Sequence, residues 1–207
     1  MLITFEGTEG CGKTTQINLL YEYLLSEGYG VVKTREPGGT PVGESIREIL
    51  THKVKEINSL TELFLMMAMR AQHIEDVIAP ALKDNKIVLC DRFFDATYAY
   101  QGFGRGIDIH IIDYINRLAT KGIVPDLTVF IDIDVEEGLR RKSEEKGQMD
   151  RFEDEDLSFH KRIKDGYWML SRENSSRFFI VDGSKDIQII HSIIRKRVEK
   201  QIELHRF

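Results

Sequence analysis

The feature that most constrains the fold is a glycine-rich turn near the start of the chain. Within the stretch FEGTEGCGKTT, Gly7, Gly12, Lys13 and Thr14 match the pattern G-x-x-x-x-G-K-[ST]. The turn follows a short apolar run, Leu2–Phe5, which we predict as a strand, and it precedes a segment with apolar residues at helical spacing. A turn in this setting directs successive backbone N–H groups and a helix N-terminus at one anion. We therefore predict a phosphate-binding loop between the first strand and the first helix of an α/β domain.

The residues of this loop have separate expected tasks. We expect the ammonium of Lys13 to reach the β- and γ-phosphates of a nucleotide and the hydroxyl of Thr14 to ligate Mg²⁺. The predicted ATP-binding residues are Gly7, Thr8, Glu9, Gly10, Cys11, Gly12, Lys13, Thr14 and Thr15. The alternative is a glycine turn that only caps a helix. Because such a match arises by chance in roughly one chain in a hundred of this size, we favour the phosphate-binding interpretation.

Four more short apolar runs predict further strands, at Val31–Thr34, Ile87–Cys90, Leu127–Ile133 and Phe178–Val181. Their near-continuous Val, Ile, Leu and Phe content is typical of parallel strands that are buried on both faces. Segments of helical periodicity cover residues 17–25, 59–84, 108–121, 135–147, 153–173 and 187–198. Helices that alternate with five strands favour a three-layer α/β fold with a parallel sheet. We expect residues 1–207 to form a single domain, because no Pro/Gly/Ser-rich linker divides them.

Composition and charge narrow the choice of partners. The net charge is -5, so the chain lacks the overall basicity of a nucleic-acid-binding protein, and any polyanion site must be a local concentration of Lys and Arg. The longest apolar run, Leu63–Met69, is too short to span a bilayer, and we expect no membrane segment. Cys11 and Cys90 are the only cysteines, which favours a reducing cytoplasm over a disulfide framework.

The third predicted strand is followed directly by a charged pair, Asp91 and Arg92. Ligands of open α/β sheets bind at this edge, where Asp91 can hold Mg²⁺ directly or through water. Arg92 offers a planar set of donors that suits a second phosphate. The alternative, a surface ion pair, would contribute little. The guanine-reading pattern N-K-x-D and the sensor pattern D-x-x-G are both missing from the sequence, which argues against a GTPase switch.

Several landmarks together resemble the thymidylate kinase family. They are FEGTEGCGKTTQ, TREPGGTPVGE, RAQH, DRF, AYQGFGRG, PDLTVFIDID and DRFE, in that order from Phe5 to Glu153. The resemblance implies a P-loop nucleoside monophosphate kinase fold with a five-stranded parallel sheet, flanking helices and a mobile lid at about residues 140–152. It implies transfer of the γ-phosphoryl group of MgATP to the 5′-phosphate of dTMP. It also implies a homodimer, for which the segment LFLMMAM could supply a helix-packing surface.

The resemblance further implies where the catalytic cations lie. Arg92 corresponds to the clamp on the acceptor phosphate. Members of the family carry a catalytic arginine either inside the phosphate loop or on the lid, and here the loop interior, Thr8–Cys11, has no cation. The lid must then supply it, and the candidates are Arg151, Arg141 and Lys142, in that order.

The implied dTMP-binding residues are Glu9, Glu36, Pro37, Arg47, Met66, Arg70, Arg92, Thr97, Tyr100 and Gln101. Among them, Glu9 would contact the 3′-hydroxyl of the sugar, Thr97 and Arg70 the thymine ring, and Tyr100 the 2′ side of the sugar. Met66 departs from the family, which usually has a stacking Phe there, although a thioether can partly replace it.

Alternatives remain open at this point. Arg70 and Arg47 could be solvated helix residues, and the segment around Glu36 could be a purely structural turn. The chain could instead be another nucleoside monophosphate or deoxynucleoside kinase, which Met66 supports best. It could also be a sensor that binds ATP without turnover, although a sensor has no need for a second pocket.

Overall fold

The structure, a computed structural model, describes residues 1–54, 56–144 and 150–205. Its centre is a five-stranded parallel sheet in the order β2-β3-β1-β4-β5. The strands are β1 (Leu2–Glu6), β2 (Val31–Arg35), β3 (Ile87–Asp91), β4 (Leu127–Asp132) and β5 (Phe178–Asp182). Each ends within one residue of its predicted end, so the predicted five-stranded α/β architecture is confirmed.

Burial differs between the centre and the edges of the sheet. The residues of β1 are fully buried, as are nearly all those of β3 and β4, because helices cover both faces. The expectation of burial on both faces is wrong for β2 and β5, whose residues are mostly half-buried or exposed. These two are the edge strands, so only one neighbour shields each of them.

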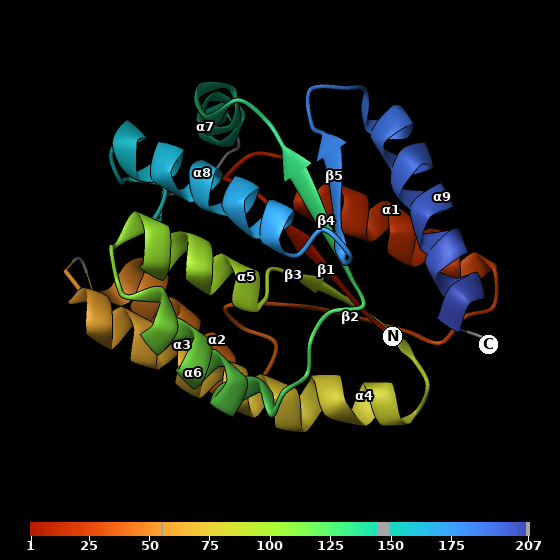
Figure 1. Ribbon diagram of the computed structural model, residues 1–207, viewed down its shortest axis with the longest axis horizontal. Helices are drawn as coiled ribbons and strands as arrows, with labels where there is room; N and C mark the ends of the chain where they lie inside the picture. The colour runs from red at the N-terminus through yellow and green to blue at the C-terminus, as the bar shows by residue number, and fades with distance from the viewer. Residues whose placement is uncertain (55, 145–149, 206–207) are drawn as a thin grey trace.

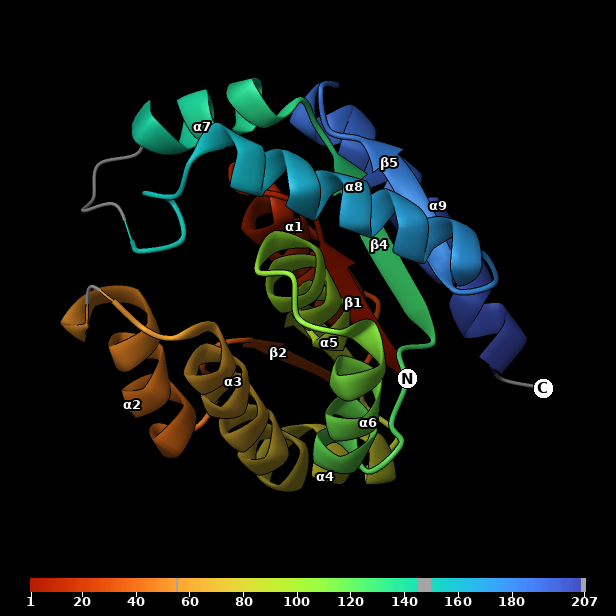
Figure 2. The same ribbon diagram turned by 60° about the vertical axis from the view of Figure 1, so that its left-hand side comes forward.

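Helices form the two outer layers (Figures 1 and 2). The α-helices are α1 (Lys13–Ser26), α2 (Pro41–Glu48), α3 (Ser59–His73), α4 (Ala79–Lys83), α5 (Phe94–Thr97), α6 (Ile109–Thr120), α7 (Val135–Glu144), α8 (Leu157–Glu173) and α9 (Ile187–His205). Three π-helical segments accompany them: η1 (Ile49–Lys53), η2 (Ile74–Ile78) and η3 (Tyr98–Gly104). α1 and α9 pack together and share one apolar core with the sheet, whereas α3, α6 and α8 enclose a second core with η3.

The helix predictions need several corrections. The segment predicted as one helix over residues 59–84 is divided into α3, η2 and α4. The helix expected over 153–173 begins at Leu157, because the carboxylate of Asp156 accepts the N–H of Phe159 and caps it. α7 ends at Glu144, and the rest of the predicted helix over 135–147 lies outside the described residues.

The topology brings five connections to one edge of the sheet. The glycine-rich loop follows β1, and Glu36, Arg92, Ile133 and Gly183 follow β2, β3, β4 and β5. Because all strands are parallel, these connections meet at their carboxyl ends, where ligands of such sheets bind. In the described part of the chain, every helix is too short or too polar to cross a membrane.

Candidate active site

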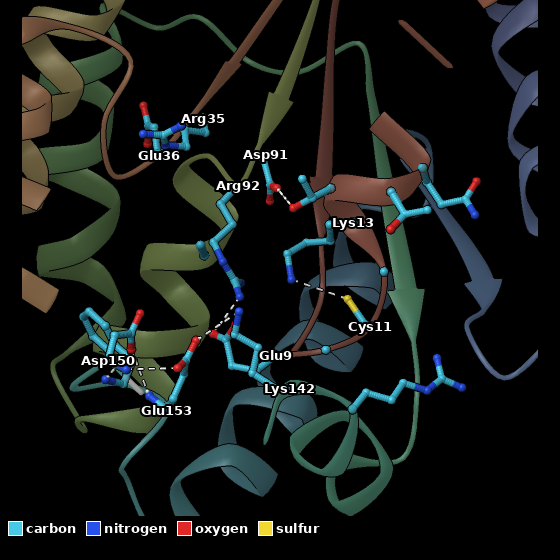
Figure 3. A pocket seen from close by; sticks show the side chains of 18 of the residues that line it. Glu9, Cys11, Lys13, Arg35, Glu36, Asp91, Arg92, Lys142, Asp150 and Glu153 are labelled. Carbon is cyan, nitrogen blue, oxygen red and sulfur yellow. Dashed lines mark hydrogen bonds and ion pairs between the residues drawn. The ribbon is translucent and has the colours of Figure 1, made fainter. Parts of the chain in front are cut away.

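A cleft of about 770 Å³ opens at this carboxyl edge. It is lined by the glycine-rich loop, by the segments that follow β2, β3 and β5, and by residues of α2, α3, η3 and α7. Figure 3 shows Lys13 and Arg92 projecting into it from α1 and from the end of β3. The predicted site residues that line the cleft are Glu9, Gly10, Cys11, Gly12, Lys13, Thr14, Thr15, Glu36, Pro37, Arg47, Met66, Asp91, Arg92, Tyr100, Gln101, Arg141 and Lys142. The predicted site residues that lie outside its lining are Gly7, Thr8, Arg70, Thr97 and Arg151.

The glycine-rich loop curls around the ammonium group of Lys13. The Nζ atom donates to the carbonyl oxygens of Gly7 (3.2 Å) and Thr8 (2.9 Å) and lies 3.4 Å from Sγ of Cys11. Gly10 has a φ of 65°, and a Cβ atom there would lie 2.0 Å from the carbonyl oxygen of Gly138. Only glycine therefore permits the close approach of this loop to α7.

Two oxygen ligands face each other beside the loop. The hydroxyl of Thr14 donates to Oδ2 of Asp91 over 2.8 Å, and both residues line the cleft. A hydroxyl and a carboxylate are hard oxygen donors, which suit Mg²⁺. Among the described residues there is no cluster of three or more His, Cys, Asp or Glu side chains that could hold a metal. This pair therefore fits a magnesium ion that takes its remaining ligands from phosphates and water.

Arg92 is held from several sides. Its backbone adopts a φ of 64°, in the left-handed region that non-glycine residues rarely occupy. Nη1 donates to the carbonyl of Gly7 (2.8 Å) and to the hydroxyl of Tyr167 (3.2 Å), and Nη2 donates to Oε1 of Glu9 (2.8 Å). The guanidinium also lies 4.9 Å from the ring centre of Tyr100. Among the described residues, these contacts use three of the five N–H donors and leave Nε and one N–H of Nη2.

Glu9 is the acid inside the loop. Its Oε1 also accepts a hydrogen bond from the hydroxyl of Tyr100 (2.6 Å). Burial alone would raise the pKa of Glu9, but the charges of Arg92 and Lys13, with the hydrogen bond from Tyr100, lower it to about 2. Glu9 is therefore a carboxylate at neutral pH, and it is hydrogen-bonded to Arg92 and Tyr100.

The interpretation of Arg70 as a solvated helix residue is wrong. Its side chain is fully buried, and Nε and Nη2 donate to Oε2 of Glu36 over 2.8 and 2.6 Å. Nη1 donates to Thr97 and Asn116 over 2.8 and 2.6 Å, and Nη2 also donates to the carbonyl of Phe93. All five donors are thus satisfied inside the protein.

Glu36 is the partner around which this network forms. Burial raises the pKa of Glu36, but Arg70 and His73 outweigh that effect and lower it. The Nδ1 atom of His73 lies 2.9 Å from Oε1 of Glu36, and its Nε2 lies 2.6 Å from the hydroxyl of Thr34. His73 therefore braces Glu36. The interpretation of the Glu36 segment as a purely structural turn is incomplete, because Glu36 and Pro37 also line the cleft.

The cleft is also lined by Arg47, Met66 and Gln101. Nη1 of Arg47 donates to the carbonyl of Pro37 over 2.9 Å, so Arg47 is not simply solvated. Nε2 of Gln101 donates to the buried carboxylate of Glu62 over 2.7 Å. Its Oε1 is buried and has no hydrogen-bond partner among the described residues.

The lid candidates divide into two groups. Arg141 and Lys142 line the cleft, and Nη1 of Arg141 donates to the carbonyl of Gly183 over 3.2 Å. Arg151, the first-ranked candidate, instead donates to Oε2 of Glu62 (2.6 Å) and to the carbonyl of Leu50 (2.9 Å). Residues 145–149 of the proposed lid lie outside the described residues.

The sequence analysis did not predict one part of the cleft lining. Gln16, Gly183, Lys185, Ile187 and Ile190 line it, and none of them was predicted. A signal was present, because a glycine and a lysine follow the fifth predicted strand at the same edge as the other strand ends. The predicted motif DRFE also contributes Phe152 and Glu153 to the lining.

A phosphate-binding loop, an oxygen pair suited to Mg²⁺ and a second cationic centre in one cleft define a nucleotide kinase of the P-loop class. The comparisons with known proteins agree. The family model described as thymidylate kinase matches residues 5–194. Thymidylate kinase from Thermoanaerobacter sp. (strain X514) is 46% identical over 200 residues, covering 97% of this chain and 98% of that protein. Thymidylate kinase from Sulfurihydrogenibium sp. (strain YO3AOP1) is 51% identical over 193 residues, covering 93% of each.

Solved structures give the same result. A crystal structure of thymidylate kinase from Ehrlichia chaffeensis superimposes with a TM-score of 0.81 and 41% identity, covering 96% of this chain and 98% of that one. The chain belongs to the thymidylate kinase family. The resemblance seen in the sequence, the fold and the assignment as a nucleoside monophosphate kinase are thereby confirmed.

Proposed function

We propose that this enzyme transfers the γ-phosphoryl group of MgATP to the 5′-phosphate of dTMP, giving ADP and dTDP, with the residue roles that follow. The observation that carries these roles is the pair of cationic centres in one cleft. Lys13 lies within the curled loop, and Arg92, directly after β3, keeps two N–H donors that no described residue accepts. One centre suits the donor phosphates, and the other suits the acceptor phosphate.

The reaction needs positioning more than proton transfer. A phosphate monoester has its second pKa near 6, so the acceptor is already largely ionised at neutral pH and needs no general base. The work of the protein is to screen two polyanions and hold the reacting oxygens in line. Lys13, which now donates to loop carbonyls, would exchange them for the β- and γ-phosphate oxygens. Arg92 would bind the 5′-phosphate through its two remaining donors.

Thr14 and Asp91 are the residues that would hold Mg²⁺. Their 2.8 Å contact supports this role, because it brings two oxygen ligands together beside the loop. When bound, the metal would neutralise charge on the transferring phosphoryl group.

At the acceptor end, Gln101 offers a buried carbonyl oxygen that has no partner in the described part of the chain. A thymine ring presents an N3–H donor that would satisfy it, and Met66 would contact the ring face. Glu9 would accept the 3′-hydroxyl, and Tyr100, bonded to Glu9, would bound the 2′ side of the sugar. Arg70 and Thr97, outside the lining, would act by fixing this wall.

The donor end and the lid complete the proposed site. We assign the lid to residues 140–152 and the lid cation to Arg141 or Lys142, since both line the cleft. The contact of Arg141 with the carbonyl of Gly183 supports a position for it over the donor nucleotide. The two free, buried thiols, Cys11 and Cys90, support a reducing cytoplasmic location.

One assay distinguishes the proposed function from two alternatives, a kinase for another nucleotide and a sensor that binds ATP without turnover. ADP release is measured with ATP and, in turn, dTMP, dUMP, CMP, AMP, GMP and thymidine. We expect dTMP to give the highest kcat/KM. A higher value with another acceptor would favour a different nucleotide kinase, which is the function that Met66 in place of the stacking Phe supports. No turnover with any acceptor would favour a sensor.

We also propose a homodimer through α3 and α6. Met67 and Met69 of the predicted packing segment belong to the core, but α3 also carries exposed Leu60 and Phe64 (56% exposed), and α6 carries exposed Leu118 (71%). α3 and α6 pack side by side, so these side chains lie on neighbouring helices. Light scattering should give twice the chain mass, and Phe64→Asp should shift it to the monomer. An unchanged mass in Phe64→Asp would reject this surface. Phe179→Asp cannot replace Phe64→Asp in this test, because Phe179 packs on the core.

A further inference from the structure

Glu6, the last residue of β1, directly precedes the glycine-rich loop, and its carboxyl group is fully buried. It does not line the cleft, and the proposed reaction gives it no task. A buried carboxyl group is costly unless its oxygens are hydrogen-bonded. The two groups that donate hydrogen bonds to Glu6 therefore indicate the role of this residue.

Both hydrogen bonds of Glu6 connect it to Arg92 or to the residue that follows Arg92. Oε1 of Glu6 accepts the backbone N–H of Phe93, the residue after Arg92, over 2.8 Å. Oε2 accepts the hydroxyl of Tyr167 over 2.8 Å, and the oxygen of that hydroxyl accepts Nη1 of Arg92 over 3.2 Å. One carboxyl group thus holds the backbone beside Arg92 directly and the guanidinium of Arg92 through a single phenol.

The backbone at Arg92 needs such support, because its φ of 64° is unfavourable for a residue with a Cβ atom. The remaining contacts hold the turn from other directions. The N–H of Arg92 donates to the carbonyl of Phe5 (3.0 Å), and Sγ of Cys90 donates to the carbonyl of Arg92 (3.0 Å). Among these contacts, the path through Tyr167 is the one that joins Glu6 to the guanidinium.

We propose that Glu6 is a positioning residue for the acceptor phosphate, acting on Arg92 through Tyr167 and the amide of Phe93. The proposal rests on the proposed role of Arg92 as the ligand of the 5′-phosphate. With Nη1 anchored to Tyr167 and Gly7, the guanidinium can present Nε and Nη2 to the phosphate in one fixed orientation.

The hydrogen-bond direction makes the role testable. The hydroxyl of Tyr167 donates its single proton to the carboxylate of Glu6, which orients its oxygen to accept from Arg92. Gln at position 6 keeps the shape and can still accept the N–H of Phe93. It presents an NH₂ group to Tyr167, however, so the phenol proton loses its acceptor and the NH₂ group competes with Arg92 as a donor to the phenol oxygen.

The ionisation of Glu6 should show the same effect. Burial, and then the charge of Asp95, raise the pKa of Glu6 to about 8, while Arg92 and the hydrogen bonds from Tyr167 and Phe93 oppose the rise. Only the ionised form can accept at both oxygens. The kcat/KM for dTMP, which reports free-enzyme ionisations, should therefore increase as the pH rises through about 8, well above the second pKa of the phosphate.

The experiment compares Glu6→Gln, Tyr167→Phe and Arg92→Ala with the control Tyr98→Phe, whose hydroxyl bonds Asp113 outside the site. KM for dTMP, KM for ATP and kcat are measured from pH 7 to 9 alongside the thermal midpoint. We expect Tyr167→Phe and Glu6→Gln to raise the KM for dTMP about tenfold, the order expected for one bond to a charged group. KM for ATP should stay within about twofold, and both variants should lose the rise near pH 8.

The outcomes separate the inference from the function on which it depends. An unchanged KM for dTMP in Tyr167→Phe and Glu6→Gln, with a raised one in Arg92→Ala, overturns the inference and leaves the role of Arg92 intact. If Arg92→Ala raises the KM for ATP instead, the proposed role of Arg92 itself fails. Equal changes in both KM values also overturn the inference, since they indicate general damage. If Glu6→Gln does not fold, Tyr167→Phe decides, because it keeps the carboxyl group and its bond to Phe93.

Discussion

The acceptor end of the cleft and its α7 side differ in how their charged groups are held. At the acceptor end, Arg70 and Glu36 are completely buried, and Arg92 and Glu9 are mostly buried. On α7, Arg140 pairs with Glu137 and Glu144 on the surface, where its side chain is more than half exposed. Buried pairs are costly to break, whereas exposed ones contribute little. We infer that the acceptor site is formed before dTMP binds, whereas the α7 side can rearrange around ATP at small cost.

Arg92→Ala should have the largest effect and would test the acceptor side of this comparison directly. It removes the proposed phosphate ligand and leaves the carboxylate of Glu9 without its main cation, so two effects oppose the binding of an anion. We expect kcat/KM for dTMP to fall on the order of 10³-fold or more, as for arginines in related phosphoryl transfer. Steady-state kinetics at saturating ATP give this value. A rise in KM for ATP with an unchanged KM for dTMP would reverse the assignment.

Arg70→Ala should mainly affect stability. It leaves Glu36 buried without its strongest partner and removes donors from Thr97 and Asn116. We expect the free energy of unfolding to fall by about 3–5 kcal/mol, as for other broken buried pairs. Urea denaturation measures it, with Arg117→Ala as the control because Arg117 forms an exposed pair on α6. Similar losses in both variants would show that burial does not distinguish the two regions.

Replacement of the two lid arginines should affect different properties, kcat in one case and stability in the other. Arg141→Ala should lower kcat by on the order of 10², the usual cost of one missing donor at developing charge. Arg151→Ala should have a smaller effect on kcat and a larger one on stability, because it breaks the buried pair with Glu62. A greater loss of kcat in Arg151→Ala would indicate that Arg151 leaves Glu62 when the lid closes, and the sequence-based order of the candidates would then be right.

The same contrast explains what the sequence could predict. The five strands and the curled loop around Lys13 follow from local patterns, namely short apolar runs and one glycine motif. The burial of Arg70 depends on partners 34, 27 and 46 residues away, and the pairing of Arg151 depends on one 89 residues away. Residue type and spacing do not encode such contacts. The π-helical segments were missed for a similar reason, since a local shift in hydrogen bonding leaves the apolar period almost unchanged.

Arg140→Ala should have the smallest effect, and it completes the comparison from the α7 side. Among the described residues, Arg140 forms ion pairs with Glu137 and Glu144, but both pairs lie on the surface and within one helix. Exposed pairs within one helix contribute little to stability, so the thermal midpoint should move by only a few degrees at most. The kinetic constants should not change, because Arg140 lies outside the cleft lining. A loss of stability comparable to that of Arg70→Ala, measured in the same urea titration, would mean that α7 is fixed as firmly as the acceptor end.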